Sequence, residues 1–143
     1  YFTRWGHPDN LGEAIREEGV SEKLKRQDVW FATQQNGQWQ PSVNIGSPVN
    51  NDDHNALCAI STDGRTALLL NRYYPDGRMA AGISTSHREA NGWTFPTPVE
   101  IKNFGLTTGR GDTYEYALSG DKKVLVIATR PARGAGGKDL HVS

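Results

Sequence analysis

Short segments of this chain occur more than once along its length. Residues 59–64 (AISTDG) align with residues 117–121 (ALSGD) at an offset of 58 positions, and the same offset aligns Leu70–Arg72 with residues 128–130 (ATR). A third copy of the last segment lies at Phe2–Arg4. A repeat of about 50–60 residues made of short apolar runs and turn residues is typical of propellers and solenoids, whose units cannot bury their apolar faces alone. The repetition therefore favours a fold of stacked, similar units.

Each unit is predicted to be a small antiparallel sheet. The apolar runs 65–72 and 123–129 follow the turns Asp63-Gly64 and Gly120-Asp121, and aspartate–glycine pairs supply the positive φ of a tight hairpin. A further strand is expected in each unit, at residues 29–33, 79–85 and 140–142. With a polar turn and one more short strand after it, a unit contains about four strands.

The fold class predicted from these units is all-β. Sheets of four antiparallel strands arranged around an axis form the blades of a β-propeller, and a closed ring takes about 4–8 of them. We expect about 2.5–3 blades here: blade 1 at about residues 1–46 with a loop inserted at 8–27, blade 2 at about 47–102, and blade 3 at about 103–143. The chain is thus expected to be a fragment of one propeller domain, and other chain segments or a second subunit would have to close the ring.

Composition excludes several classes of protein. The formal net charge is +0, from 16 basic and 16 acidic side chains, so the basic excess of a nucleic-acid-binding protein is absent. No apolar stretch approaches the length of about 18 residues that a membrane-spanning helix needs. The single cysteine, Cys58, rules out an internal disulfide framework and is expected to be a small buried core residue.

The combined motifs resemble a known repeat. They comprise a strand at Asp28–Thr33, the segment Asn36–Pro41 (NGQWQP), a polar link at 50–53 (NNDD), the turn 60–64 (ISTDG) and an apolar strand that ends at Arg72. This order is similar to the WD40-like, TolB-type β-propeller repeat of bacterial envelope proteins, many of which also carry an OmpA-like domain. The resemblance covers most of the chain outside residues 8–27. Two departures are Ala80, where the family usually has Asp, and the altered order Ser119-Gly120-Asp121.

The resemblance implies a function and a location. Proteins with this repeat are mostly periplasmic or associated with the outer membrane, and their propeller is regarded as an interaction module. We therefore expect a non-catalytic binding or scaffold module that engages a protein or a glycan, including a peptidoglycan-associated partner. The alternative is a fragment of a propeller hydrolase that acts on glycans or peptides, with catalytic residues partly on absent blades. The sequence offers no convergent acid, base and nucleophile, and so the chain is more readily interpreted as a binding protein than as an enzyme.

The inserted loop at residues 8–27 is the first candidate for a partner contact. It is rich in charge, and long insertions on a rigid scaffold often carry specificity. Its candidate contact residues are Glu13, Arg16 and Lys23, and one short helix is expected from Leu11 to Glu18. The alternative interpretation is a solvated surface loop.

A second candidate is the set of arginines at the repeated strand end, namely Arg4, Arg72 and Arg130. Equivalent positions in successive blades lie at the same level, and these side chains could form a ring of positive charge. The simpler interpretation is that each arginine makes a salt bridge or stacks on an aromatic side chain such as Trp5, Tyr73 or Tyr74.

Two further features have structural and functional interpretations. Asp52 and Asp53 could provide oxygen ligands to calcium, but the segment lacks the ligand spacing of a dedicated calcium loop, and Asx turns in a link between blades are the preferred interpretation. No other cofactor is expected. Trp39 and Trp93 follow equivalent polar turns, and we expect both to fill gaps between neighbouring sheets.

Overall fold

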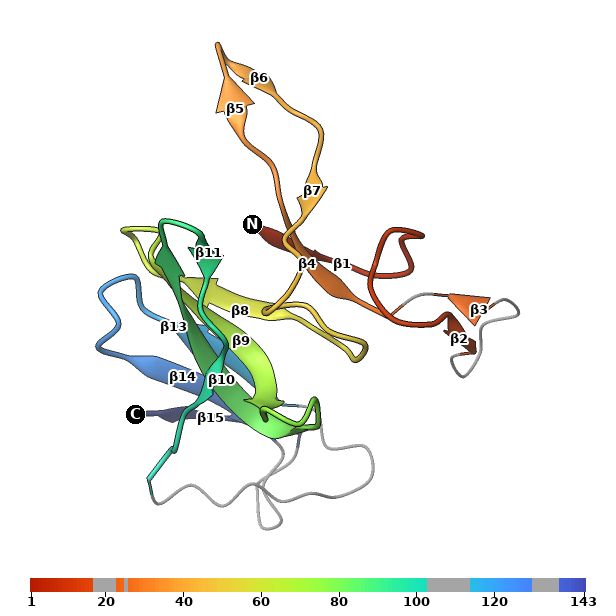
Figure 1. The fold of residues 1–143 in the computed structure, drawn as a ribbon. Helices are drawn as coiled ribbons and strands as arrows, with labels where there is room; N and C mark the ends of the chain where they lie inside the picture. Colours follow the sequence, from red (N-terminus) through yellow and green to blue (C-terminus); the bar gives the residue numbers. More distant parts are fainter. Residues whose placement is uncertain (17–22, 25, 103–113, 130–136) are drawn as a thin grey trace.

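The protein is an all-β structure. The computed structural model describes residues 1–16, 23–24, 26–102, 114–129 and 137–143, and no residue in these ranges is helical. The strands form three larger antiparallel sheets and two small two-stranded ones (Figure 1). The predicted fold class is confirmed at this level. The sheets do not close into a ring within the described ranges, and so the propeller and its blade boundaries stay a prediction.

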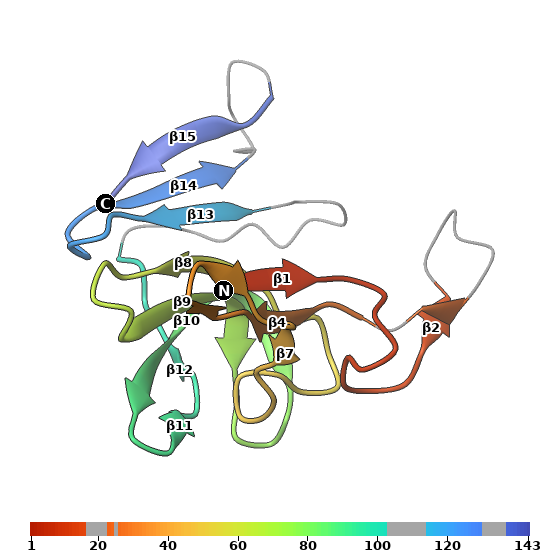
Figure 2. The same ribbon diagram turned by 90° about the horizontal axis from the view of Figure 1, so that it is seen from above.

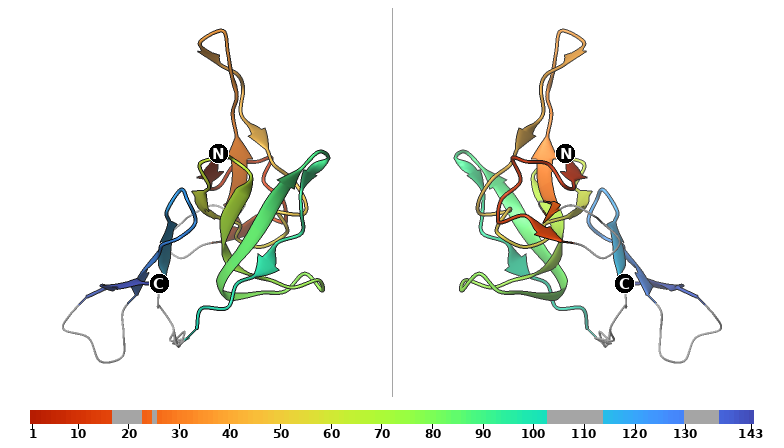
Figure 3. Two further views of the ribbon diagram at one scale, coloured as in Figure 1. Left: turned by 90° about the vertical axis from the view of Figure 1, so that its left-hand side faces the viewer. Right: turned by 90° about the vertical axis from the view of Figure 1, so that its right-hand side faces the viewer.

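The first sheet has the strand order β1–β4–β7, with β1 at Phe2–Arg4, β4 at Asp28–Phe31 and β7 at Val43–Asn44. A separate hairpin of β5 (Gln34–Gln35) and β6 (Gln38–Trp39) extends from it and projects away from the rest of the molecule in both side views (Figure 3). Asn36 and Gly37 in its turn both have positive φ, at 49° and 77°. This geometry is typical of a type I′ turn, in which Asn-Gly is strongly preferred.

The central sheet runs β8–β9–β10 and continues to β11 and β12. These strands lie at Leu57–Ile60, Thr66–Tyr73, Met79–Glu89, Gly92–Trp93 and Thr97–Pro98. The register between β9 and β10 shifts between Ala80 and Ile83. Gly82 lies at this shift with a φ of 138°, and a Cβ there would come within 2.7 Å of the Arg72 side chain. Glycine is therefore required at this position.

The third sheet has the order β13–β14–β15, at Glu115–Leu118, Leu125–Thr129 and Asp139–Val142. The predicted hairpins β8–β9 and β13–β14 are both antiparallel. In their turns, Ser61 donates a hydrogen bond to Asp63 and Ser119 donates one to Asp121, each at 2.6 Å.

The positive φ of the two turns comes from different residue types. Gly64 has a φ of 68°, and the corresponding residue of the second turn is Lys122, with a φ of 63°. The expectation that Gly120-Asp121 provides this conformation through its glycine is therefore wrong. The residue after the aspartate adopts the left-handed conformation, whatever its type.

Two apolar clusters hold the three larger sheets together, and β9 contributes to both. Ala67 and Leu69 lie in the first cluster with Val29 and Val49, whereas Leu68 lies in the second with Ile83, Tyr116 and Ile127. Successive side chains of a strand point to opposite faces, so the central sheet is covered on both faces. We call the contact of the central sheet with the first sheet and residues 44–55 the first joint. The contact of the central sheet with the third sheet is the second joint. In the second joint β13 lies beside β8 (Figure 2).

The short helix expected from Leu11 to Glu18 is not formed in the described part of this segment. Ile15–Arg16 form strand β2, which pairs antiparallel with β3 at Lys23–Leu24. Gly12 has a φ of 73°, and its Cα packs so closely on the backbone of Asp52 that a side chain would not fit. A residue in the left-handed conformation cannot belong to a right-handed helix, so the conformation of Gly12 excludes the helix that we expected from the sequence of this segment.

Candidate binding surface

A buried polar network joins the first sheet to the central sheet. The Asp28 carboxylate is fully buried and accepts three hydrogen bonds. Its Oδ2 accepts from the Leu11 backbone N–H and from Asn44 Nδ2, both at 2.7 Å, and its Oδ1 accepts from Asn55 Nδ2 at 3.3 Å. Both oxygens are thus used in holding neighbouring segments, which is a structural role.

The network continues through buried asparagines. Asn50 pairs with the Val29 backbone, because its Oδ1 accepts from Val29 N–H and its Nδ2 donates to Val29 O, both at 2.9 Å. The Tyr73 hydroxyl donates to Asn55 Oδ1 at 3.0 Å. Burial, followed by the nearby charge of Asp28, raises the pKa of Tyr73. The tyrosine stays protonated, and its donated bond to Asn55 persists at ordinary pH.

Asn10 anchors the start of the inserted loop. Its Nδ2 donates to the backbone oxygens of Arg4 and Arg26, and its Oδ1 accepts from the indole N–H of Trp30 at 2.8 Å. Beyond this anchor, Glu13 is exposed, and Arg16 and Lys23 face each other in the backbone register of β2 and β3. The loop therefore presents its candidate residues from a fixed base.

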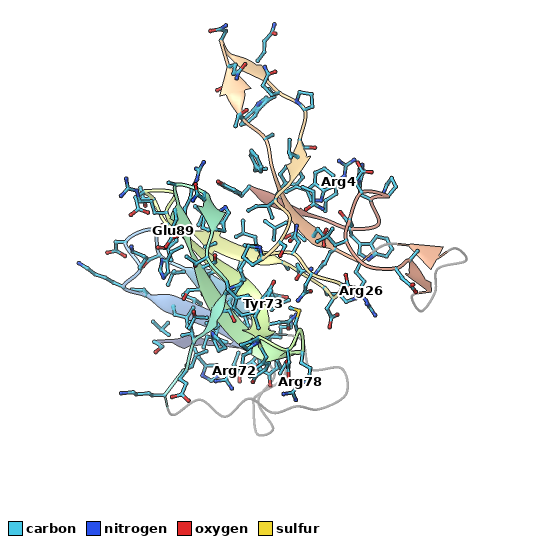
Figure 4. The ribbon with its side chains drawn as sticks, viewed as in Figure 1. Arg4, Arg26, Arg72, Tyr73, Arg78 and Glu89 are labelled. Atoms are coloured by element: carbon cyan, nitrogen blue, oxygen red, sulfur yellow. The ribbon has the colours of Figure 1, made fainter. Side chains whose placement is uncertain are left out.

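The structure does not bring Arg4 and Arg72 together. Figure 4 shows them well apart, and Arg130 lies outside the described residues. The Arg4 guanidinium lies over the Trp30 ring, 5.2 Å from its centroid, and Arg72 Nε is buried with no hydrogen-bond partner in the described part of the chain. For Arg4 the stacking interpretation is confirmed, but the aromatic partner is Trp30, which lies opposite Phe2 in the strand register.

The segment with Asp52 and Asp53 forms an Asx turn, as expected. The Asp53 N–H donates to Asn51 Oδ1 at 2.9 Å, and the Arg26 Nε lies 4.0 Å from Asp53 Oδ1. Across the described ranges no three His, Cys, Asp or Glu side chains are grouped closely enough to hold a metal ion. The nearby arginine already supplies positive charge to this carboxylate.

The two equivalent tryptophans have different environments. Trp93 packs on the first apolar cluster and lies edge-to-face on Tyr1, with ring centroids 5.7 Å apart. Trp39 is 72% exposed on the projecting β5–β6 hairpin. The prediction that both fill gaps between sheets is confirmed for Trp93 and wrong for Trp39, because no sheet formed by the described residues lies against the hairpin. Sequence analysis therefore missed Trp39 as a candidate contact residue.

We define the candidate binding surface as the β5–β6 hairpin with Trp39, together with the β2–β3 pair that carries Arg16 and Lys23. The two elements lie at opposite ends of the first sheet (Figure 1), and the described side chains of the β5–β6 hairpin belong to neither apolar cluster. No family model, curated protein or solved structure matches this chain. Among the described residues no helix is long and apolar enough to cross a membrane.

Proposed function

We propose that this chain is part of a non-catalytic binding propeller, a scaffold module of a bacterial envelope protein that engages a glycan or protein partner. The observation that carries this proposal is the exposure of Trp39 on a projecting hairpin. A large aromatic side chain that is 72% exposed suits contact with another molecule, and tryptophan is enriched at binding hot spots.

Three observations support the propeller part of the proposal. Neighbouring strands of all three larger sheets pair antiparallel, the sheets stack through apolar clusters, and the β8–β9 and β13–β14 turns have the same Ser-to-Asp hydrogen bond. Stacked blades of this kind leave their loops free to vary. The assignment to the bacterial envelope rests on the resemblance of the repeat.

The chemistry of the candidate surface fits a glycan that carries charged groups. The flat face of an indole ring can cover the apolar face of a sugar ring. Arg16 and Lys23 belong to the β2–β3 pair at the other end of the first sheet and could attract carboxylates of a long polymer (Figure 1). Peptidoglycan combines sugars with carboxylates, and so it is the partner that we propose to test first.

The alternative of a hydrolase receives no support from Asp28. It is the one fully buried carboxylate in the described ranges, and its oxygens accept bonds from three neighbouring N–H groups. A catalytic carboxylate needs access to substrate.

Binding can be tested with purified peptidoglycan sacculi in a sedimentation assay. We expect the wild-type chain to pellet with sacculi, and Trp39→Ala to lose at least about tenfold in affinity, as for a hot-spot residue. Phe95→Ala is the matched control, because Phe95 is an exposed aromatic residue (46%) in the connection between β11 and β12, outside the candidate binding surface. Failure of the wild type to bind sacculi, or equal binding by the Trp39 variant, would contradict the proposal.

A further inference from the structure

The two sheets that meet at the second joint leave a cavity between them. It has a volume of about 360 Å³, and residues of both sheets line it. Its walls are mainly aliphatic, formed by Leu68, Ile83, Val99, Leu118 and Leu125. Protein interiors contain few voids larger than a water molecule, whereas sites for small molecules have volumes of about 300–1,000 Å³ and mostly apolar walls. The cavity therefore has the size and the lining of a ligand site.

The lining changes from apolar to polar along the cavity. On β10, the side chains of Ile83, Thr85 and His87 lie on one face of the strand, and the series begins buried at Ile83 and ends exposed at His87. The partner strand repeats this order, because Leu68 pairs with Thr85 and Thr66 pairs with His87. The Thr66 hydroxyl oxygen lies 3.4 Å from His87 Nδ1. One end of the cavity is therefore aliphatic and the other carries hydroxyl and imidazole groups.

The polar end also carries a positive charge. Lys122 lines the cavity from the turn before β14, and its Nζ lies 4.0 Å from Asp63 Oδ2. Asp63 belongs to the turn that leads into β9, and so Lys122 lies at the same end as His87. Asp63 is not part of the lining, and its Oδ1 accepts hydrogen bonds within its own turn. An anionic group at this end of the cavity would face an ammonium group and hydrogen-bond donors.

We infer that this cavity binds a small amphiphile, namely a carboxylate with an apolar chain of about eight carbons. At the roughly 30 Å³ that a water molecule occupies in the liquid, the cavity has room for about twelve non-hydrogen atoms. The chain packs between Leu68, Ile83 and the leucines of the third sheet. The carboxylate lies at the polar end, where Lys122 and His87 neutralise and orient it. This site lies outside the candidate binding surface and adds a ligand to the proposed function.

An NMR titration of the wild-type chain with octanoate tests the inference. We expect a Kd below about 1 mM, with the largest amide shifts between Leu118 and Leu125 and none at Val29 or Asn50 in the first joint. Octanol has the same chain without the charge and should bind about fivefold more weakly. Octylamine should bind more weakly still, because its ammonium group would face that of Lys122.

A matched pair of lysine variants tests the position of the carboxylate. Lys122 has a φ of 63°, which asparagine tolerates, and Lys122→Asn should weaken octanoate binding about fivefold and leave octanol binding unchanged. Lys123→Asn is the control, because Lys123 lies next in the sequence, points to Asp121 at 3.9 Å and does not line the cavity. Thermal unfolding of both variants checks that they are folded.

Several results would overturn the inference. Absence of saturable shifts up to about 10 mM octanoate shows that the cavity is no site for this ligand. Equal affinity for octanoate and octylamine removes the role of the positive end, and it does so in the wild-type chain without any variant. Equal effects of Lys122→Asn and Lys123→Asn indicate attraction to the surface in general. Trp39→Ala should leave octanoate binding unchanged, so this inference and the proposed function fail separately.

Discussion

The two joints of this molecule bury similar apolar side chains but differ in their polar contacts. The first joint adds a network of buried carboxylate, amide and phenol groups around Asp28, in which each polar group has a defined partner. The second joint has one backbone hydrogen bond between turns, a Tyr116 hydroxyl without a partner in the described ranges, and a cavity of about 360 Å³ bordered by Leu68, His87 and Leu125. Satisfied polar networks fix one arrangement, whereas apolar contacts tolerate sliding. The first joint should therefore be rigid and the second adaptable.

Truncation of neighbouring leucines in β9 should give the largest effects. Leu69 is completely buried in the first joint and Leu68 is buried in the second. We expect Leu69→Ala to lower the free energy of unfolding by about 4 kcal/mol and Leu68→Ala by about 3 kcal/mol, because a site that borders an existing cavity loses fewer contacts. Urea denaturation measures both. A larger loss for Leu68→Ala would reverse the ranking of the joints.

Removal of the Asp28 carboxylate, the central hydrogen-bond acceptor of the first joint, should have the next largest effect on the free energy of unfolding. Asp28→Ala removes the acceptor of the Leu11 N–H and one of the acceptors of the Asn44 and Asn55 side-chain amides. We expect a loss of about 2–3 kcal/mol in the free energy of unfolding, because buried polar groups would become unsatisfied. Asp28→Asn keeps one acceptor oxygen and should lose less. Equal stability of Asp28→Ala and the wild type would show that the network does not hold the first joint.

A matched pair of hydroxyl deletions compares the joints directly. Tyr73→Phe removes the donor to Asn55 Oδ1 and should cost about 1 kcal/mol, whereas Tyr116→Phe removes an unpartnered hydroxyl and should be neutral or slightly stabilising. Thermal unfolding at one pH measures both variants. The comparison fails if Tyr116→Phe is the more destabilising substitution.

Sequence analysis predicted the local features of this fold well. The hairpins at Asp63-Gly64 and Gly120-Asp121 are formed, because turn residues and apolar runs act over a few positions. It did not predict the network of Asp28, because Asn44, Asn50 and Asn55 converge only after the chain has folded. It also placed Trp39 in a gap between sheets. A repeated tryptophan indicates a place beside a neighbouring sheet, but the sequence does not say whether that neighbour is present.

The smallest effect concerns the thiol of Cys58, which packs against the second apolar cluster. Burial raises its pKa from 9.0 to about 11. At pH 8 the native thiolate should be about 100-fold scarcer than in the unfolded chain, and reaction with a disulfide reagent should be slower to a similar degree. Because the folded pKa is raised, this contribution to stability is fully present below pH 9 and is lost as the pH rises through 11.

The same thiol reports on the second joint. Leu68→Ala should accelerate the reaction of Cys58 more than Leu69→Ala does, because it loosens the contact that covers the sulfur. The rate of thiol modification at pH 8, measured in both variants and in the wild type, decides this. Equal acceleration by the two substitutions would mean that the joints open together, and the contrast between a rigid and an adaptable joint would then be lost.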